Sequence, residues 1–190
     1  MPRNQAQRMF FAFVTVLITV HSYVFYSLYV INGNTLISVN PGASGVLDAI
    51  HMQGGVYMAG RFVPIWVVVI AEFILAYCLE ILVGQPASFK LAVKVFNPKE
   101  THPVLFESSI ICATVGIMCP AMSFLAAFLY YPYYSGFSII TLLANWLKLV
   151  CFNFPFAFFT QMFFIQPLVR TIFKTVYRKD IAARKEPMQA

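Results

Sequence analysis

The sequence predicts an all-α integral membrane protein. We expect a four-helix bundle made of two tandem, parallel helical-hairpin repeats, with basic amphipathic segments at the membrane interface. Three observations predict this architecture: the composition, four long apolar stretches, and a short sequence that occurs twice. Of the 190 residues, 60% are hydrophobic and only 11% are charged. A soluble domain of this size needs a polar surface, which thirteen cations and seven anions do not supply.

Four apolar stretches are long enough to cross a hydrocarbon core of about 30 Å at about 1.5 Å per residue. They cover roughly residues 9–31, 62–83, 104–130 and 137–165. The first follows Arg3 and Arg8, as the core of a signal peptide would. Its apolar run is longer than such a core, and no convincing small-residue cleavage site follows it. We therefore expect a retained first helix.

The distribution of cations predicts the orientation. In a four-span arrangement eleven of the thirteen cations share one side: Arg3, Arg8, Lys90, Lys94, Lys99, Arg170, Lys174, Arg178, Lys179, Arg184 and Lys185. Arg61 and Lys148 remain on the other side. Cytoplasmic loops carry an excess of lysine and arginine, so both termini are expected in the cytoplasm of a bacterial cell, beneath its inner (plasma) membrane. The cations would then contact anionic lipid, and no basic folded domain is left to bind nucleic acid.

The repeated sequence is a Gln-Pro pair followed by a basic tail. Gln85-Pro86 ends the second apolar stretch, and Gln166-Pro167 ends the fourth, eighty-one residues later. Aligning the pairs also brings Ala76 onto Ala157 and Glu80 onto Gln161. We therefore predict two units, residues 1–99 with a long outer loop at 32–61 and residues 100–190 with a basic cytoplasmic tail. Because each unit crosses twice, both enter from the same side, as in a parallel repeat.

Each basic tail has cations four residues apart, the spacing that places side chains on one helical face. The candidate contacts to lipid headgroups are Lys90, Lys94, Arg170, Lys174 and Arg178. Such a helix lies at the inner surface with its apolar face in the acyl chains, and the preceding proline turns the chain toward that surface.

Within the outer loop, "SGVLDAIHMQGG" predicts a short helix capped by Ser44 and ended by Gly54. Asp48 and His51 would share one face of it. Two side chains are too few to hold a metal, so no metal site is expected. An outer gate or lid is the favoured role, because the second unit has no such insertion. The four cysteines lie inside predicted spans without CxxC spacing and are expected to be free packing residues.

The helices that end in "GQPASFKLAVKVF" and "IQPLVRTIFKTVY" resemble an uncharacterised bacterial membrane family built from one or two copies of a two-helix domain of unknown function. The resemblance spans most of residues 6–180. It implies a small multi-pass inner-membrane protein, and it brings no catalytic residues.

Polar residues inside the predicted spans are the candidate site. Glu72 lies near the middle of the second span and His21 at a similar depth in the first, so they are predicted to form a proton-sensitive or cation-coupling pair. The alternative is that Glu72 only bonds neighbouring helices together. Asn153 is the residue aligned with Glu72 in the second unit. Secondary candidates are Glu80, which could pair with Lys90 or Arg170, and Gln161 and Lys148; Pro120 and Pro155 are predicted to kink their helices.

The sequence contains no glycine-rich phosphate loop, HExxH or GxSxG motif, so neither an enzyme nor a cofactor is expected. Two functions stay open. One is a small transport or ion- and proton-coupling component, which with so few helices would need a homodimer or a larger membrane complex. The other is a non-transporting scaffold, assembly or accessory protein. Loss of pH-dependent activity on Glu72→Gln substitution would favour the first.

Overall fold

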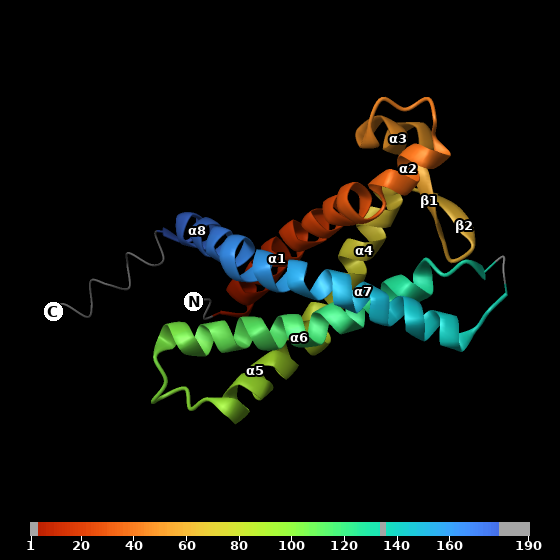
Figure 1. The fold of residues 1–190 in the computed structure, drawn as a ribbon. Helices are drawn as coiled ribbons and strands as arrows, with labels where there is room; N and C mark the ends of the chain where they lie inside the picture. The colour runs from red at the N-terminus through yellow and green to blue at the C-terminus, as the bar shows by residue number, and fades with distance from the viewer. Residues whose placement is uncertain (1–3, 134–135, 179–190) are drawn as a thin grey trace.

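The computed structural model describes residues 4–133 and 136–178. The two long helices of the first half are α1 (Gln5–Phe25), extended by the π-helical segment η1 (Tyr26–Ile31), and α4 (Ile65–Leu79), extended by the π-helical segment η2 (Glu80–Gly84) and by α5 (Gln85–Val95). The second half contains α6 (Pro103–Leu129) and α7 (Ile139–Thr160), which continues through η4 (Gln161–Ile165) into α8 (Gln166–Val176). Figure 1 shows these helices running along one another, with chain reversals at both ends.

Four of these continuous helices are long and apolar enough to cross a membrane, which suggests membrane association: Gln5–Ile31, Ile65–Val95, Pro103–Leu129 and Ile139–Val176. The prediction of a mainly helical chain with four such segments is confirmed. The second and fourth are longer than predicted, because the helix continues through both Gln-Pro pairs. Each proline occupies the second position of the next helix, where its missing N–H removes little helical hydrogen bonding.

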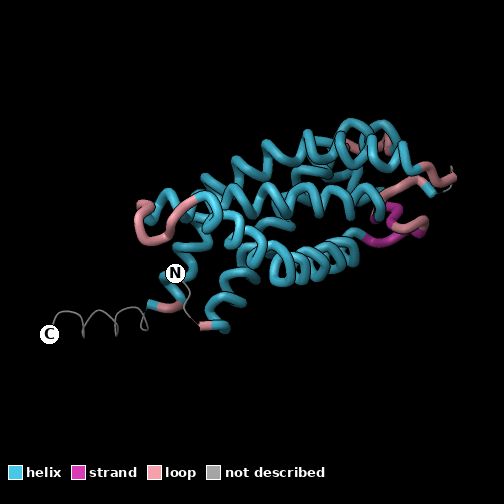
Figure 2. Tube along the Cα trace, turned by 90° about the horizontal axis from the view of Figure 1, so that it is seen from below, coloured by secondary structure: helices cyan, strands magenta, loops and turns pink. Residues whose placement is uncertain are grey.

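Between η1 and α4 the chain forms a small outer subdomain of α2 (Gly33–Val39), α3 (Val46–Gln53), β1 (Gly55–Met58) and β2 (Arg61–Pro64). The strands pair as an antiparallel hairpin, an element that the sequence analysis does not predict in this mainly helical chain. Ala59 and Gly60 both have positive φ, of 51° and 75°, as a two-residue hairpin turn requires. The figures place this subdomain at the end of the bundle opposite to the start of α1 and the end of α8 (Figures 1 and 2).

The predicted helix in this subdomain exists, but it begins later than expected. Gly45 rather than Ser44 is the N-cap of α3, and no side chain caps it. The Ser44 backbone N–H and hydroxyl instead donate to Asp48 Oδ2, at 2.8 and 3.1 Å. The predicted end is confirmed, because Gly54 has a left-handed φ of 70° after the last helical residue.

The helices touch through small residues. Ala76 packs against Val16 and Val20 between α4 and α1, and Ala157 packs against Val115 and Cys119 between α7 and α6. Small side chains let helix backbones approach closely, which is the usual way in which helices associate in lipid. Large side chains stay at the periphery of the bundle, where many phenylalanines and isoleucines are exposed. The bundle therefore has little apolar core of its own.

Candidate functional site

A large central cavity of about 2250 Å³ lies between the long helices. Its volume exceeds the roughly 300–1,000 Å³ of pockets that hold a drug-sized ligand. On α1 two neighbouring residues in each turn line it: Gln7 and Arg8, Phe11 and Ala12, Thr15 and Val16, Thr19 and Val20, Tyr23 and Val24. This spacing follows the period of a helix, so one face of α1 forms a wall of the cavity along its length.

Glu72 on α4 lines this cavity, and α4 begins directly after strand β2 of the outer subdomain. The Tyr130 hydroxyl, which follows the end of α6, donates a hydrogen bond to Glu72 Oε1. The backbone next to Tyr130 also holds the hairpin, because the Ala59 N–H donates to the Leu129 carbonyl at 2.6 Å. Glu72 is thus joined to the part of the chain that supports the outer subdomain.

The predicted pairing of His21 with Glu72 is wrong. His21 Nδ1 lies 2.7 Å from the carbonyl oxygen of Leu17 on its own helix, and the residue is exposed. His21 lines a smaller groove of about 580 Å³ between α1 and α7, with Ser22 and Phe156, and not the central cavity. The physical reason is helical phase. Counting residues along a helix gives the depth of a side chain. The direction in which the side chain points rotates by about 100° around the helix axis with each residue, so position 21 points to a different side of α1 than the cavity-lining position 19.

Glu80 also lines the central cavity, at the start of η2. The predicted ion pairs of Glu80 with Lys90 or Arg170 are not formed within residues 4–133 and 136–178. Its carboxylate lies over Gly84, where an alanine Cβ would be 2.6 Å from Glu80 Oε2 and 2.9 Å from Met118 Sδ. Glycine at position 84 therefore leaves the space that the carboxylate occupies.

The remaining candidates are two amide side chains that hydrogen-bond to neighbouring helices, a lysine, and two prolines inside helices. Asn153 Nδ2 donates to Ser123 Oγ at 3.3 Å, and Gln161 Nε2 donates to Thr19 Oγ1 at 2.7 Å. All four side chains line the cavity, as does the exposed Lys148. Pro120 lies inside α6 and Pro155 inside α7, and neither interrupts its helix. The Pro120 carbonyl accepts a hydrogen bond of 2.9 Å from Trp146 Nε1, so this region also joins α6 to α7.

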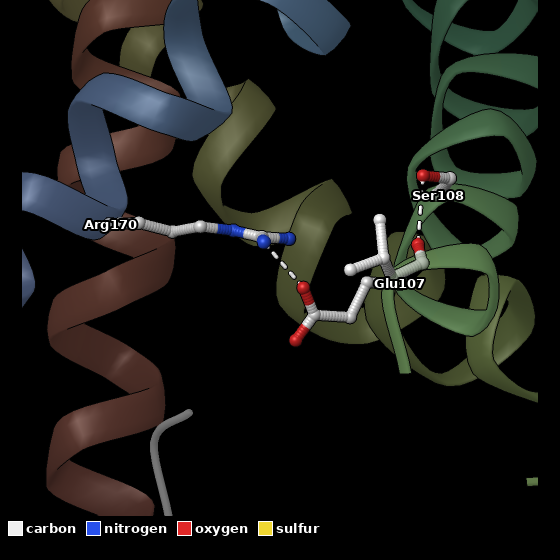
Figure 3. A network of polar contacts seen from close by, with 4 residues as sticks. Glu107, Ser108 and Arg170 are labelled. Atoms are coloured by element: carbon white, nitrogen blue, oxygen red, sulfur yellow. Dashed lines mark hydrogen bonds and ion pairs between the residues drawn. The ribbon is translucent and has the colours of Figure 1, made fainter. Parts of the chain in front are cut away.

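The two basic tails differ in a way that the sequence analysis missed. Arg170 and Lys174 on α8 line the central cavity, whereas Lys90 and Lys94 on α5 do not. Arg170 forms an ion pair with Glu107 near the start of α6, and Figure 3 shows the arginine reaching across to that helix. Cations spaced by four residues signalled one basic face in each tail, but nothing in the spacing says what each face meets.

Outside the long helices, the hydrogen bonds from the Ser44 backbone N–H and hydroxyl lower the pKa of Asp48. Asp48 and His51 belong to no potential metal site, since no cluster of three ligating side chains occurs in the part of the chain that the structure describes. The four cysteines are free.

No curated protein and no solved structure matches the chain. Residues 104–177 match the model of a protein family described as "Domain of unknown function (DUF2798)". The matched segment contains α6, α7, η4 and α8, and therefore Glu107, Arg170, Asn153 and Gln161. This supports the expectation of a domain-of-unknown-function family, and the second half of the chain is similar to the domain that defines it.

Proposed function

We propose that this protein is a small transport or ion- and proton-coupling component of the bacterial cytoplasmic membrane, with the central cavity as its pathway. The observation that carries the proposal is the position of Glu72. An ionisable side chain within a membrane span is costly and therefore rare, and such residues usually line functional cavities. Glu72 faces the cavity and not the outside of the bundle. The chain itself would perform no catalysis and hold no cofactor.

The proposed architecture is two tandem hairpins, residues 1–99 and 100–190. Its support is the agreement of element bounds: η2 begins at Glu80 and η4 at Gln161, and α5 and α8 begin at Gln85 and Gln166. The segments η2 and η4 have five residues each, and the helices that follow them, α5 and α8, have eleven residues each. A π-helical segment is rare and often marks a functional site, so the same segment at the same offset favours two copies of one unit.

The proposed orientation puts the starts of α1 and α6 and the ends of α5 and α8 in the cytoplasm, where their cations contact anionic lipid. Figure 1 has these ends on one side of the bundle. The outer subdomain would act as a lid, because Val56 of its hairpin lines the same cavity as Glu72. A homodimer or a larger complex would supply the further helices that a solute pathway needs.

The second candidate is a non-transporting scaffold, assembly or accessory protein. It is favoured by the hydrogen bonds that join distant helices, from Gln161 to Thr19 and from Asn153 to Ser123. In this account the polar residues serve only to hold helices together.

Proton flux in reconstituted vesicles separates the two candidates. The protein is placed in liposomes with a trapped pH-sensitive dye, a potassium diffusion potential is applied, and wild type is compared with Glu72→Gln. We expect wild-type flux well above that of empty vesicles, and its loss in the variant. Glu100→Gln is the matched control, because Glu100 is exposed and does not line the cavity. If wild type conducts no protons and Glu72→Gln only lowers thermal stability, the scaffold account replaces this one.

A further inference from the structure

We propose that the end of the cavity formed by α8 and the starts of α1 and α6 binds an amphipathic anion: an apolar chain that carries a carboxylate or phosphate headgroup. Arg170 would receive the headgroup and the apolar walls of the cavity the chain. The proposal names a ligand class for the central cavity and so rests on the proposed function.

Charge supports an anionic headgroup. Four cations line this end of the cavity: Arg8, Arg170, Lys174 and Arg178. Glu107 is the acid that lies among them, and it neutralises Arg170. Within the described residues, three cations at this end therefore remain without an ion pair. Converging cations in a pocket with low-dielectric walls raise the local concentration of anions.

The rotational orientation of α8 brings its cations to the cavity. A basic composition alone would not do so. Arg170 and Lys174 are four residues apart on α8 and so share one face, which is a face that lines the cavity. Arg178 lines the cavity from just beyond the end of the helix. Lys90 and Lys94 of α5 have the same spacing, and their face does not line it. Contact with bilayer lipid alone would not require this difference between two helices of equal length.

The walls of the cavity are mostly apolar, although polar side chains such as Glu80 also line them. Phe11 and Val16 of α1 contribute apolar side chains, as do Ile110, Val115 and Met118 of α6. Methionine adapts to ligands of varied shape, and the volume of about 2250 Å³ leaves room for a long chain. A small hydrophilic anion would leave this apolar surface without a partner.

Arg170 is the residue suited to the headgroup. A guanidinium binds carboxylate or phosphate through two parallel hydrogen bonds. Its present partner is itself a carboxylate, that of Glu107, and the arginine side chain is 39% exposed. Glu107 thus occupies the position that a headgroup would take, and the headgroup must displace it. This displacement would break the contact between α8 and α6 that Figure 3 shows.

If the headgroup displaces Glu107 from Arg170, substitutions at these two residues should change the binding affinity in opposite directions. Binding of a fluorescent long-chain fatty acid to the purified full-length protein is measured in a non-ionic detergent. We expect Arg170→Gln and Lys174→Gln each to weaken binding about tenfold, which corresponds to about 1.4 kcal/mol. Glu107→Gln removes the competing carboxylate and should tighten binding several-fold. Lys94→Gln is the matched control and should change nothing.

Three results would overturn the proposal. An ion pair that is only structural would make Glu107→Gln and Arg170→Gln weaken binding alike. A nonspecific basic surface would make Lys94→Gln weaken binding as much as Lys174→Gln, a variant that breaks no ion pair. If the uncharged methyl ester binds as tightly as the acid, the headgroup site does not exist.

Competition distinguishes the sources of the headgroup. A long-chain phosphate monoester should displace the probe as the fatty acid does, whereas inorganic phosphate should displace it only at far higher concentration. Equal potency of inorganic phosphate would show a site for free phosphate and contradict the role of the apolar walls. Proton flux that depends on Glu72 without fatty acid binding would refute this ligand class alone. Binding without flux would refute the transport proposal and leave the site standing.

Discussion

Asp48 shows how a single carboxylate fixes the start of a helix. Hydrogen bonds from the Ser44 backbone N–H and hydroxyl lower its pKa in the folded chain. A carboxyl with a lowered pKa stabilises the folded state above the pKa of the unfolded chain, about 3.9, and loses this contribution as pH falls through the folded value. The position in the first turn of α3 adds a favourable interaction with the helix dipole.

We therefore expect the contacts around Ser44 to be intact at neutral pH and to loosen below about pH 4. An NMR titration of the Ser44 amide proton measures this directly. Asp48→Asn is the control and should remove the transition. A Ser44 amide signal that does not change as pH falls below about 4 would contradict this account.

Two glycines provide a matched pair of substitutions. An alanine Cβ at Gly55 would lie 2.3 Å from the Val63 carbonyl oxygen across the hairpin, and backbone cannot move aside cheaply. Gly55→Ala should lower the free energy of unfolding by about 1–3 kcal/mol. At Gly116 in α6 a Cβ would meet nothing within 4 Å. Gly116→Ala should raise stability by up to about 1 kcal/mol through helix propensity.

Thermal unfolding of both variants in detergent measures the difference. Equal melting temperatures would mean that the strands do not approach as closely as described.

At the scale of elements, helices were predictable and their contacts were not. A long apolar stretch predicts a membrane-spanning helix because, in lipid, the backbone N–H and C=O groups must hydrogen-bond to one another within the segment. The hairpin was missed because Phe62 and Val63 continue an apolar run, although Ala59-Gly60 provides a turn. The π-helical segments carry no known sequence signal. The repeated Gln-Pro pairs marked where these segments end, but not their geometry.

For the site, likewise, the residues that line the cavity were largely predictable, and the contacts between them were not. Glu72, Asn153, Glu80 and Gln161 were chosen because polar residues in apolar spans are costly, and all line the cavity. His21 was chosen on the same ground and lies elsewhere, because depth can be counted along a helix whereas the facing direction depends on its neighbours. Tyr130 was missed because it lies at the edge of the third apolar stretch and no local pattern relates it to Glu72, fifty-eight residues earlier. No local pattern relates Glu107 to Arg170, sixty-three residues away.

The contact of η4 with α1 includes one hydrogen bond, from Gln161 to Thr19. Interhelical hydrogen bonds of this kind contribute on average about 0.6 kcal/mol and at most about 1.7 kcal/mol. We expect a double-mutant cycle of Gln161→Leu and Thr19→Val to give a coupling energy in this range, measured by unfolding in mixed micelles. A coupling energy near zero would show that the two side chains do not meet in the membrane.

For the whole molecule, the exposed apolar residues and the cavity have one explanation. The many exposed phenylalanines and isoleucines suit a surface that contacts lipid, in agreement with the four helices that are apolar enough to cross a membrane. Several polar side chains line the cavity instead, from Arg170 on α8 to Glu72 on α4. Such an inside-out distribution is expected of a bundle that encloses a polar path through a bilayer.

Cysteine accessibility tests this central claim most directly. The native cysteines are replaced by alanine, and single cysteines are placed at Thr15, which lines the cavity, and at Leu17, which does not. A membrane-impermeant thiol reagent is then added to inside-out membrane vesicles. We predict rapid labelling at position 15 and none at position 17, because only the first reaches water through the cavity. Equal labelling at both positions, or none at either, would contradict the account.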